Sequence, residues 1–294
     1  MSFPLYPVYA QNKVSAGYEY IISRENNYSD SYFSYNFSAR GSNVILSYNR
    51  TDGRNAEYDP LQKVMLAYYY MGDNHMFGAI AMSASDKPFN TFETTSMIGF
   101  YGYSIFSKVI GKESVPLPNG EMYEYDRKTA LYVGVGASRE PIVFGGYFLP
   151  VFSYVYQGKH LYLTLGLPMT SIAFIPSQMH RFMYVINFTG TGDLKYEFRP
   201  TPTDNFAFEY VEAQNAYRLS DVVVHSENKD SRLIYQESWF RVKYNRMFSN
   251  DFGITAGFAM MTNGYRFSGK YYHESPSGRL APVIKYIVST EIKF

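Results

Sequence analysis

Apolar and polar residues alternate along much of this chain, from about residue 13 to its end. The clearest run spans residues 282–294, where Ile284, Tyr286, Val288, Thr290, Ile292 and Phe294 alternate with Lys285, Ser289, Glu291 and Lys293. Residues 33–38, 161–167, 193–199 and 240–245 follow the same pattern. Successive side chains of a strand point to opposite faces of a sheet, so this period of two predicts strands with two unlike faces.

Segments rich in Gly, Pro, Asn or Asp separate the alternating runs. Short ones lie at residues 39–43, 72–75, 157–159, 200–204 and 249–251, and longer polar ones at 24–30, 51–62, 84–95, 225–231 and 273–281. Short and long connections mostly alternate, which is typical of a barrel with tight turns at one end and freely growing loops at the other.

The pattern predicts one all-β domain over residues 1–294, a transmembrane antiparallel up-and-down β-barrel of about 14 strands, with 12 or 16 as alternatives. The expected strands begin near residues 13, 31, 43, 63, 76, 96, 129, 142, 160, 181, 205, 233, 252 and 282.

Two segments complicate this strand count. Residues 107–128 contain Pro116 and Pro118 and are too long for the tight turn expected there. We interpret them either as an inward constriction or plug or as an extended loop. Asn263 and Gly264 form a hairpin signal inside an otherwise continuous strand.

The composition favours a membrane barrel over a soluble protein. Aromatic residues make up 19% of the chain, with 31 Tyr and 23 Phe against one Trp. Such rings are enriched where a barrel wall meets lipid and headgroups. The chain has no run of the roughly 18 apolar residues that a membrane helix needs. Its first residues have neither a basic leader nor an apolar core, so we expect the mature form of an exported protein.

Other function classes find little support. The absence of Cys excludes disulfides, thiolate nucleophiles and Cys-ligated metals. A net charge of +1 is too small to indicate a nucleic-acid-binding surface. The five His residues are scattered, and Gly134 and Gly136 lack the third glycine and the helix of a nucleotide site. We expect no metal and no cofactor, and we interpret the two glycines as small residues that let a strand curve.

The last segment resembles the carboxy-terminal assembly signal of bacterial outer-membrane β-barrel proteins, in which a terminal Phe follows apolar or aromatic residues at every second position. The matching residues are Phe294, Ile292, Val288 and Tyr286, with Thr290 a weaker fit. The resemblance implies a location in the bacterial outer membrane, contact with its lipid, termini in the periplasm and recognition of this strand by the barrel-assembly machinery. It implies no particular function.

Two polar loops could carry chemistry. His273 and Ser275 resemble the His-x-Ser segment of outer-membrane phospholipases, but that family orients its His with a later Asn, and no Asn follows Ser275. Asp52, Asn55, Glu57 and Asp59 offer oxygen ligands for Ca²⁺ at a spacing that matches no known calcium loop. We favour solvated loops in both places and expect no enzyme.

Charged residues at polar positions of several expected strands would project into the barrel. They are Glu19, Lys195, Glu197, Arg199, Glu209, Arg241, Lys243, Lys285, Glu291 and Lys293. Such residues either line an aqueous path or pair across a narrow barrel and seal it. We predict a porin-like passive channel for small polar solutes. The alternatives are a non-conducting barrel that anchors or assembles with another outer-membrane or surface protein, and a lipid-modifying barrel enzyme.

Overall fold

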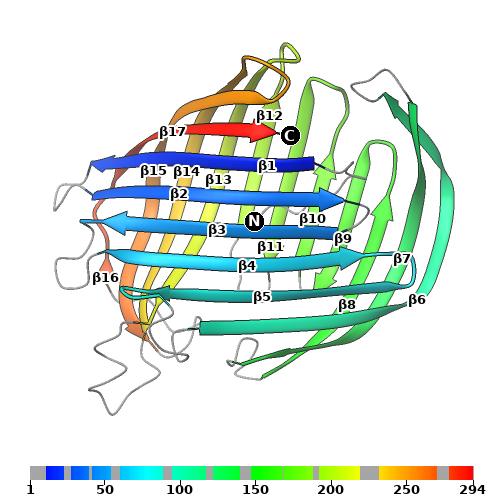
Figure 1. Ribbon diagram of the computed structural model, residues 1–294, viewed down its shortest axis with the longest axis horizontal. Helices are drawn as coiled ribbons and strands as arrows, with labels where there is room; N and C mark the ends of the chain where they lie inside the picture. The colour runs from blue at the N-terminus through cyan, green and yellow to red at the C-terminus, as the bar shows by residue number, and fades with distance from the viewer. Residues whose placement is uncertain are drawn as a thin grey trace.

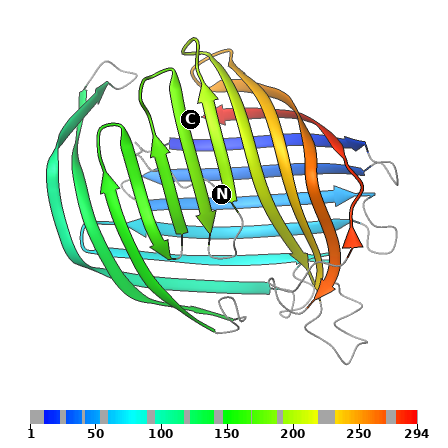
Figure 2. The same ribbon diagram turned by 180° about the vertical axis from the view of Figure 1, so that it is seen from behind.

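The chain forms one antiparallel β-sheet that closes on itself. The computed structural model describes residues 11–22, 28–39, 42–53, 60–88, 95–116, 122–139, 147–167, 169–187, 192–218, 232–269 and 278–293, and these contain no helix. From β1 to β15 each strand pairs with the next one in sequence, β15 pairs directly with β17, and β17 pairs with β1. The result is an up-and-down barrel, seen from opposite sides in Figures 1 and 2.

The strands differ widely in length. The first eight are β1 (Gln11–Ile22), β2 (Tyr28–Ala39), β3 (Ser42–Asp52), β4 (Leu61–Met71), β5 (His75–Ser85), β6 (Thr95–Pro116), β7 (Met122–Ser138) and β8 (Phe148–Gln157). The others are β9 (Leu161–Leu167), β10 (Met169–Phe174), β11 (His180–Asn187), β12 (Gly192–Phe198), β13 (Asp204–Tyr217), β14 (Arg232–Met247), β15 (Phe252–Gly269), β16 (Gly278–Arg279) and β17 (Ile284–Lys293).

The barrel has 16 strands, because the two-residue β16 is an addition beside β15 within a sheet of 17. The predicted all-β barrel is confirmed. Its strand number is 16, the larger of the two alternatives to the predicted 14. The pattern had not separated β9 from β10 or β11 from β12, since strands of six to eight residues alternate too few times to be told apart.

The described residues within 107–128 form neither a plug nor a loop. Residues 107–116 belong to β6 and 122–128 to β7, and the two strands pair from Ile98 and Ser138 to Pro116 and Met122. β5 pairs with β6 only as far as Tyr103, so this hairpin extends past its neighbours at the right of Figure 1. Phe106, Ser107, Lys108, Val109 and Ile110 are all exposed, which corrects the expectation of an inward constriction.

The Asn263-Gly264 signal is a bulge and not a hairpin turn. Ser238 pairs with Asn263 and Trp239 with Met261, so Thr262 is an extra residue in β15. A bulge of this kind bends a strand and increases its twist without ending it.

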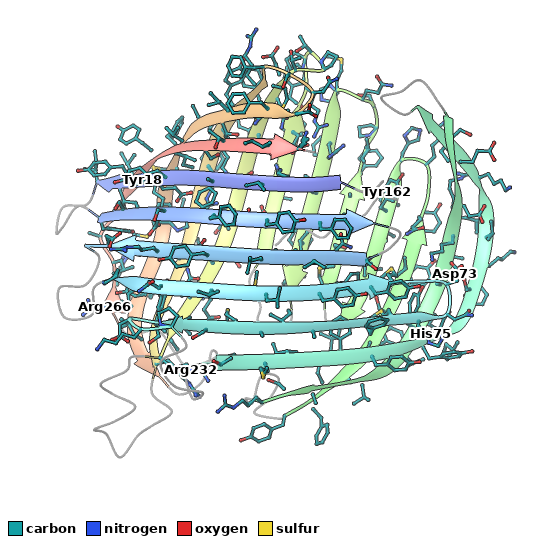
Figure 3. The ribbon with its side chains drawn as sticks, viewed as in Figure 1. Tyr18, Asp73, His75, Tyr162, Arg232 and Arg266 are labelled. Atoms are coloured by element: carbon teal, nitrogen blue, oxygen red, sulfur yellow. The ribbon has the colours of Figure 1, made fainter. Side chains whose placement is uncertain are left out.

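The two ends of the barrel differ in their connections. Residues 72–74, 158–160, 175–179, 199–203 and 248–251 connect strands at one end, where the paired residues Lys13 and Lys293 also lie. Asp73 and His75 mark this short-turn end, and Arg232 and Arg266 mark the opposite, long-loop end (Figure 3).

The outer surface of the barrel is apolar. Along β17, Ile284, Tyr286 and Val288 are 47%, 52% and 55% exposed, whereas the intervening Lys285 and Ile287 are buried. Similar exposed apolar residues occur around the ring, including Phe33, Leu66, Tyr101, Phe152, Leu194 and Phe258. An apolar surface of this extent is typical of a wall that faces lipid.

An aromatic belt surrounds part of the short-turn end. The ring centroids of Phe182 and Tyr196 lie 4.8 Å apart, and those of Phe206 and Tyr244 lie 5.0 Å apart. His180 stacks between Tyr196 and Phe198 and contacts the Tyr196 hydroxyl at 2.8 Å through Nδ1. Belts of this kind mark the level at which membrane barrels meet headgroups.

Candidate functional site

One side of the barrel interior carries a wall of charged side chains. The register aligns Lys195 of β12, Glu209 of β13 and Arg241 of β14 in one row, and Ala259 and Lys285 continue it across β15 and β17. All ten residues singled out from the sequence lie on this inner face: Glu19, Lys195, Glu197, Arg199, Glu209, Arg241, Lys243, Lys285, Glu291 and Lys293. Their role in selectivity stays a prediction.

Glu197 and Glu209 anchor the first group of charges on this wall. Lys195 Nζ lies 2.7 Å from Glu197 and 3.6 Å from Glu209, and Lys243 Nζ donates to Glu209 at 2.7 Å. Arg199 and Arg181 approach Glu197 at 2.8 Å and 3.6 Å. Both carboxylates are nearly buried, so cations on the same strand and on adjacent strands provide the compensation that a buried charge requires.

Lys285 is the centre of a second, more deeply buried group. Its Nζ lies 2.9 Å from Glu19 and 2.8 Å from Asp30, and 4.4 Å from the centroid of the Trp239 ring. Thr51 donates a hydrogen bond of 2.6 Å to Asp30 from the next strand. The sequence pattern identified Lys285 and Glu19 but missed Asp30, which is paired with Glu19 in the β1–β2 register.

A third group lies near the short-turn end. Glu291 pairs with Lys13 across the seam between β17 and β1, and Lys293 Nζ lies 3.3 Å from the same carboxylate. All three groups therefore join residues of one strand or of nearby strands. They line the wall and do not cross the interior.

Arg241 lies between the first and second groups. Its Nε is buried and has no hydrogen-bond partner among the described residues. The carboxylates of Glu209 and Glu19, on either side of it along the wall, already accept hydrogen bonds from Lys243 and Lys285. Its neighbour on β15 is Ala259, which is fully buried in a cluster with Ile21 and Trp239.

Part of the inner face of β5 to β8 is apolar, which the sequence pattern did not predict. Met76, Ala130, Tyr132, Val151 and Val155 form a buried cluster there, against which Met71 and Phe100 pack. Tyr132 donates a hydrogen bond of 2.7 Å to the Gly72 carbonyl, which ties this cluster to the β4–β5 turn. The sequence feature that could have indicated an apolar inner wall is the weak alternation of β4. Met65 points inward and Leu66 outward, and both are apolar.

Apolar side chains also fill the interior near the long-loop end. One cluster contains Leu61, Ala84, Tyr217, Leu233 and Tyr235, and a second contains Ile21, Tyr28, Trp239, Ala259, Met261, Val283 and Ile287. Leu280 packs against both clusters. The two clusters together form what we call the inner constriction.

Opposite walls of the barrel touch at the inner constriction. The Arg218 amide donates to the Ala84 carbonyl at 2.9 Å, which joins the ends of β13 and β5 across the barrel. Lys63 of β4 also donates to Asn215 of β13 at 3.3 Å. The barrel is therefore narrowest at this level within the described part of the chain.

The other sequence candidates form no site in the described structure. His273, Ser275, Asn55, Glu57 and Asp59 lie outside the described residues, as does Phe294. Asp52 is paired with Arg50 at 2.8 Å. Gly134 lies in β7, where a Cβ atom would come within 2.0 Å of the Tyr101 carbonyl oxygen, and Gly136 has a similar close contact with β6.

No set of three or more His, Asp or Glu side chains in the described ranges is placed to hold a metal ion. No helix among these residues is long and apolar enough to cross a membrane.

A closed 16-strand barrel with an apolar exterior and a charged inner wall is typical of transmembrane, porin-like β-barrels. No model of a known protein family matches the chain, and no curated protein matches it in sequence.

Several solved structures are similar to the chain. The CymD monoaromatic hydrocarbon channel has 9% identity and a TM-score of 0.43, over 98% of this chain and 89% of that one. The Acinetobacter baumannii outer membrane protein Omp33 has 12% identity and a TM-score of 0.40, over 98% and 100%. The NanC porin has 9% identity and a TM-score of 0.37, over 96% and 100%. Because these sequence identities and TM-scores are low, the solute has to be inferred from the chain's own side chains.

Proposed function

We propose that the protein is a narrow passive channel of the bacterial outer membrane that carries small polar solutes. The observation that supports this best is the charged inner wall, which runs from Lys13 and Lys293 near the short-turn end to the group around Lys285. Its ion pairs connect residues along the wall and leave the interior between the walls unbridged at these levels. Barrels of about 16 strands are of the size that encloses an aqueous path.

The inner constriction supports a second candidate. The contacts between Arg218 and Ala84 and between Lys63 and Asn215 join opposite walls at the long-loop end. If they persist in the membrane, the barrel does not conduct and serves as an anchor or assembly partner for another surface protein. Both candidates use the same lipid-facing exterior, so conduction is the property that separates them.

The test is single-channel conductance of the refolded chain in a planar bilayer. We expect steady, ohmic conductance from protein whose folding is verified by its heat-dependent gel mobility. Substitution of Lys243 by Gln removes a cation from the inner wall and should shift ion selectivity toward cations. Arg246→Gln is the matched control, because Arg246 lies on the same strand but faces outward.

Two results would count against the channel. No conductance from protein that is shown to be folded and inserted would favour the non-conducting barrel. Equal changes in selectivity for Lys243→Gln and Arg246→Gln would show that ions do not pass along the charged wall.

A further inference from the structure

We propose that the interior of the barrel binds small divalent oxyanions near its short-turn end, where the guanidinium groups of Arg181 and Arg199 lie beside Glu197. This inference rests on the proposed function, since it narrows the small polar solutes of the channel to one class. The two arginines belong to neighbouring segments of the chain, in β11 and directly after β12, so one small ligand can reach both.

Glu197 is surrounded by cations on three sides. Lys195 and Arg199 flank it along β12, and Arg181 is its partner in the β11–β12 register. Arg199 and Arg181 approach the same carboxylate oxygen, Glu197 Oε2, at 2.8 Å and 3.6 Å. Two guanidinium groups that share one oxygen atom are close enough to donate hydrogen bonds to a single small oxyanion.

The group around Glu197 has more positive than negative charges. Its members are four cations and two carboxylates, namely Arg181, Lys195, Arg199 and Lys243 with Glu197 and Glu209. The excess is therefore two positive charges. Asp193 and Arg241 interact with this group from its deeper side, and because their charges are opposite they leave the excess unchanged. A divalent anion would neutralise the group.

The cations of this group are more exposed than its carboxylates. The side chains of Arg199 and Arg181 are 38% and 27% exposed, whereas that of Glu197 is 5% exposed. Lys243 is likewise more exposed than Glu209, at 22% against 7%. A solute that enters the barrel here meets positive charge first, with the compensating carboxylates beneath it.

The aromatic belt places this group near the opening of the barrel. His180, Tyr196 and Phe198 of the belt alternate along β11 and β12 with Arg181 and Glu197, so the rings lie outside and the charges inside at one level. Because such belts mark the headgroup level, dissolved ions reach the inner face there.

A second group at the short-turn end has the same imbalance. Glu291 is shared by Lys13 and Lys293, again more cations than carboxylates. The ratio is reversed deeper in the barrel, where Lys285 is shared by two carboxylates. The two short-turn groups together give this end an excess of positive charge, which attracts anions.

The experiment is isothermal titration calorimetry of the refolded chain in detergent micelles with sodium sulfate, at an ionic strength kept constant with sodium chloride. Sulfate is the probe because it is divalent at neutral pH, and sodium nitrate is the monovalent comparison. We expect saturable heat with sulfate, and half-saturation at about tenfold or more higher concentration for nitrate. Arg199→Gln should raise the half-saturation concentration for sulfate by about tenfold or more, because it removes charged hydrogen-bond donors.

Arg181→Gln is a second test of the same site from a different strand, and we expect a loss of similar size. Arg246→Gln is the matched control, because Arg246 lies at the same end of the barrel but faces outward, and it should leave sulfate binding unchanged. Heat-dependent gel mobility verifies the folding of each variant. If one arginine variant of the site does not fold, the other decides alone.

The outcomes separate this inference from the proposed function. Nitrate binding as tight as sulfate binding, or unchanged sulfate binding in either folded arginine variant of the site, would overturn the divalent-anion site even if the barrel conducts ions. Sulfate binding with the expected dependence on Arg199, in a barrel that conducts no ions, would support the site and overturn the channel. An equal loss in Arg246→Gln would reduce the effect to the overall charge of the chain and also overturn the site.

Discussion

The ammonium group of Lys285 lies 2.9 Å from the carboxylate of Glu19, and this ion pair connects the last strand of the barrel to the first. The two residues are 266 positions apart in sequence, yet they lie on adjacent strands of the β1–β17 seam. Both are buried, so the pair forms only when the barrel closes. Closure and charge compensation are thus achieved by the same contact.

Replacement of Lys285 by Met should destabilise the closed barrel. The substitution keeps most of the side-chain volume but leaves the carboxylates of Glu19 and Asp30 without their shared cation. Removing one partner of a buried ion pair costs about 3 kcal/mol or more. Urea unfolding in lipid vesicles, followed by Trp239 fluorescence, measures the loss. Lys293→Met is the control, because Glu291 keeps Lys13, and a loss as large as for Lys285 would contradict this account.

Gly134 should tolerate no side chain, whereas Gly99 should. A Cβ atom on Gly134 would lie 2.0 Å from the backbone oxygen of Tyr101, so the two strands would have to move apart. A Cβ atom on Gly99 would have the Gly78 backbone oxygen as its nearest neighbour, at 3.9 Å, an ordinary contact. We expect Gly134→Ala to cost about 1 to 3 kcal/mol in urea unfolding and Gly99→Ala almost nothing. Equal costs would show that β6 and β7 are not packed as described.

The sequence predicted the barrel because most strands have unlike faces. In β17, apolar Ile284 and Tyr286 flank Lys285, so both the strand and its orientation could be derived. In β4, Met65 and Leu66 are both apolar, so the pattern gave no sign that this inner wall differs from the rest. Long-range partners such as Asp30 and Lys285 depend on how the ring closes. No local pattern contains that information.

A charge on the outer surface should destabilise the barrel in a membrane. Leu66 is 52% exposed and lies at the middle of β4, where a lipid-facing residue would be at the centre of the bilayer. Leu66→Arg should cost about 2 to 4 kcal/mol in vesicle-based unfolding, because the guanidinium has to be transferred into hydrocarbon. Leu66→Met keeps the surface apolar and serves as the control. An arginine variant as stable as the methionine variant would argue that this face does not contact lipid.

Widening the inner constriction should increase conductance. Tyr217 and Tyr235 meet edge to face with ring centroids 6.2 Å apart, and Tyr235 is 1% exposed. Tyr235→Ala removes a ring from the narrowest level of the described barrel, so single-channel current at fixed voltage should rise. Tyr18→Ala removes the same ring from the outer surface, where Tyr18 is 51% exposed, and should leave the current unchanged. Unchanged current in Tyr235→Ala would mean that this level does not limit flow.

The terminal Phe should affect assembly in cells more than folding in vitro. Tyr286, Val288 and Ile292 lie on the exposed outer face of β17, where another protein can reach them before the barrel is surrounded by lipid. Because these residues and Phe294 resemble the outer-membrane assembly signal, we propose that the assembly machinery recognises them. Phe294→Ser should lower the yield of heat-modifiable barrel in outer-membrane fractions. The same variant should refold into detergent as the unchanged chain does, since no assembly factor is present there. Lys293→Gln, one residue earlier on the inner face, is the control, and equal membrane yields for the two variants would contradict recognition of the terminal residue.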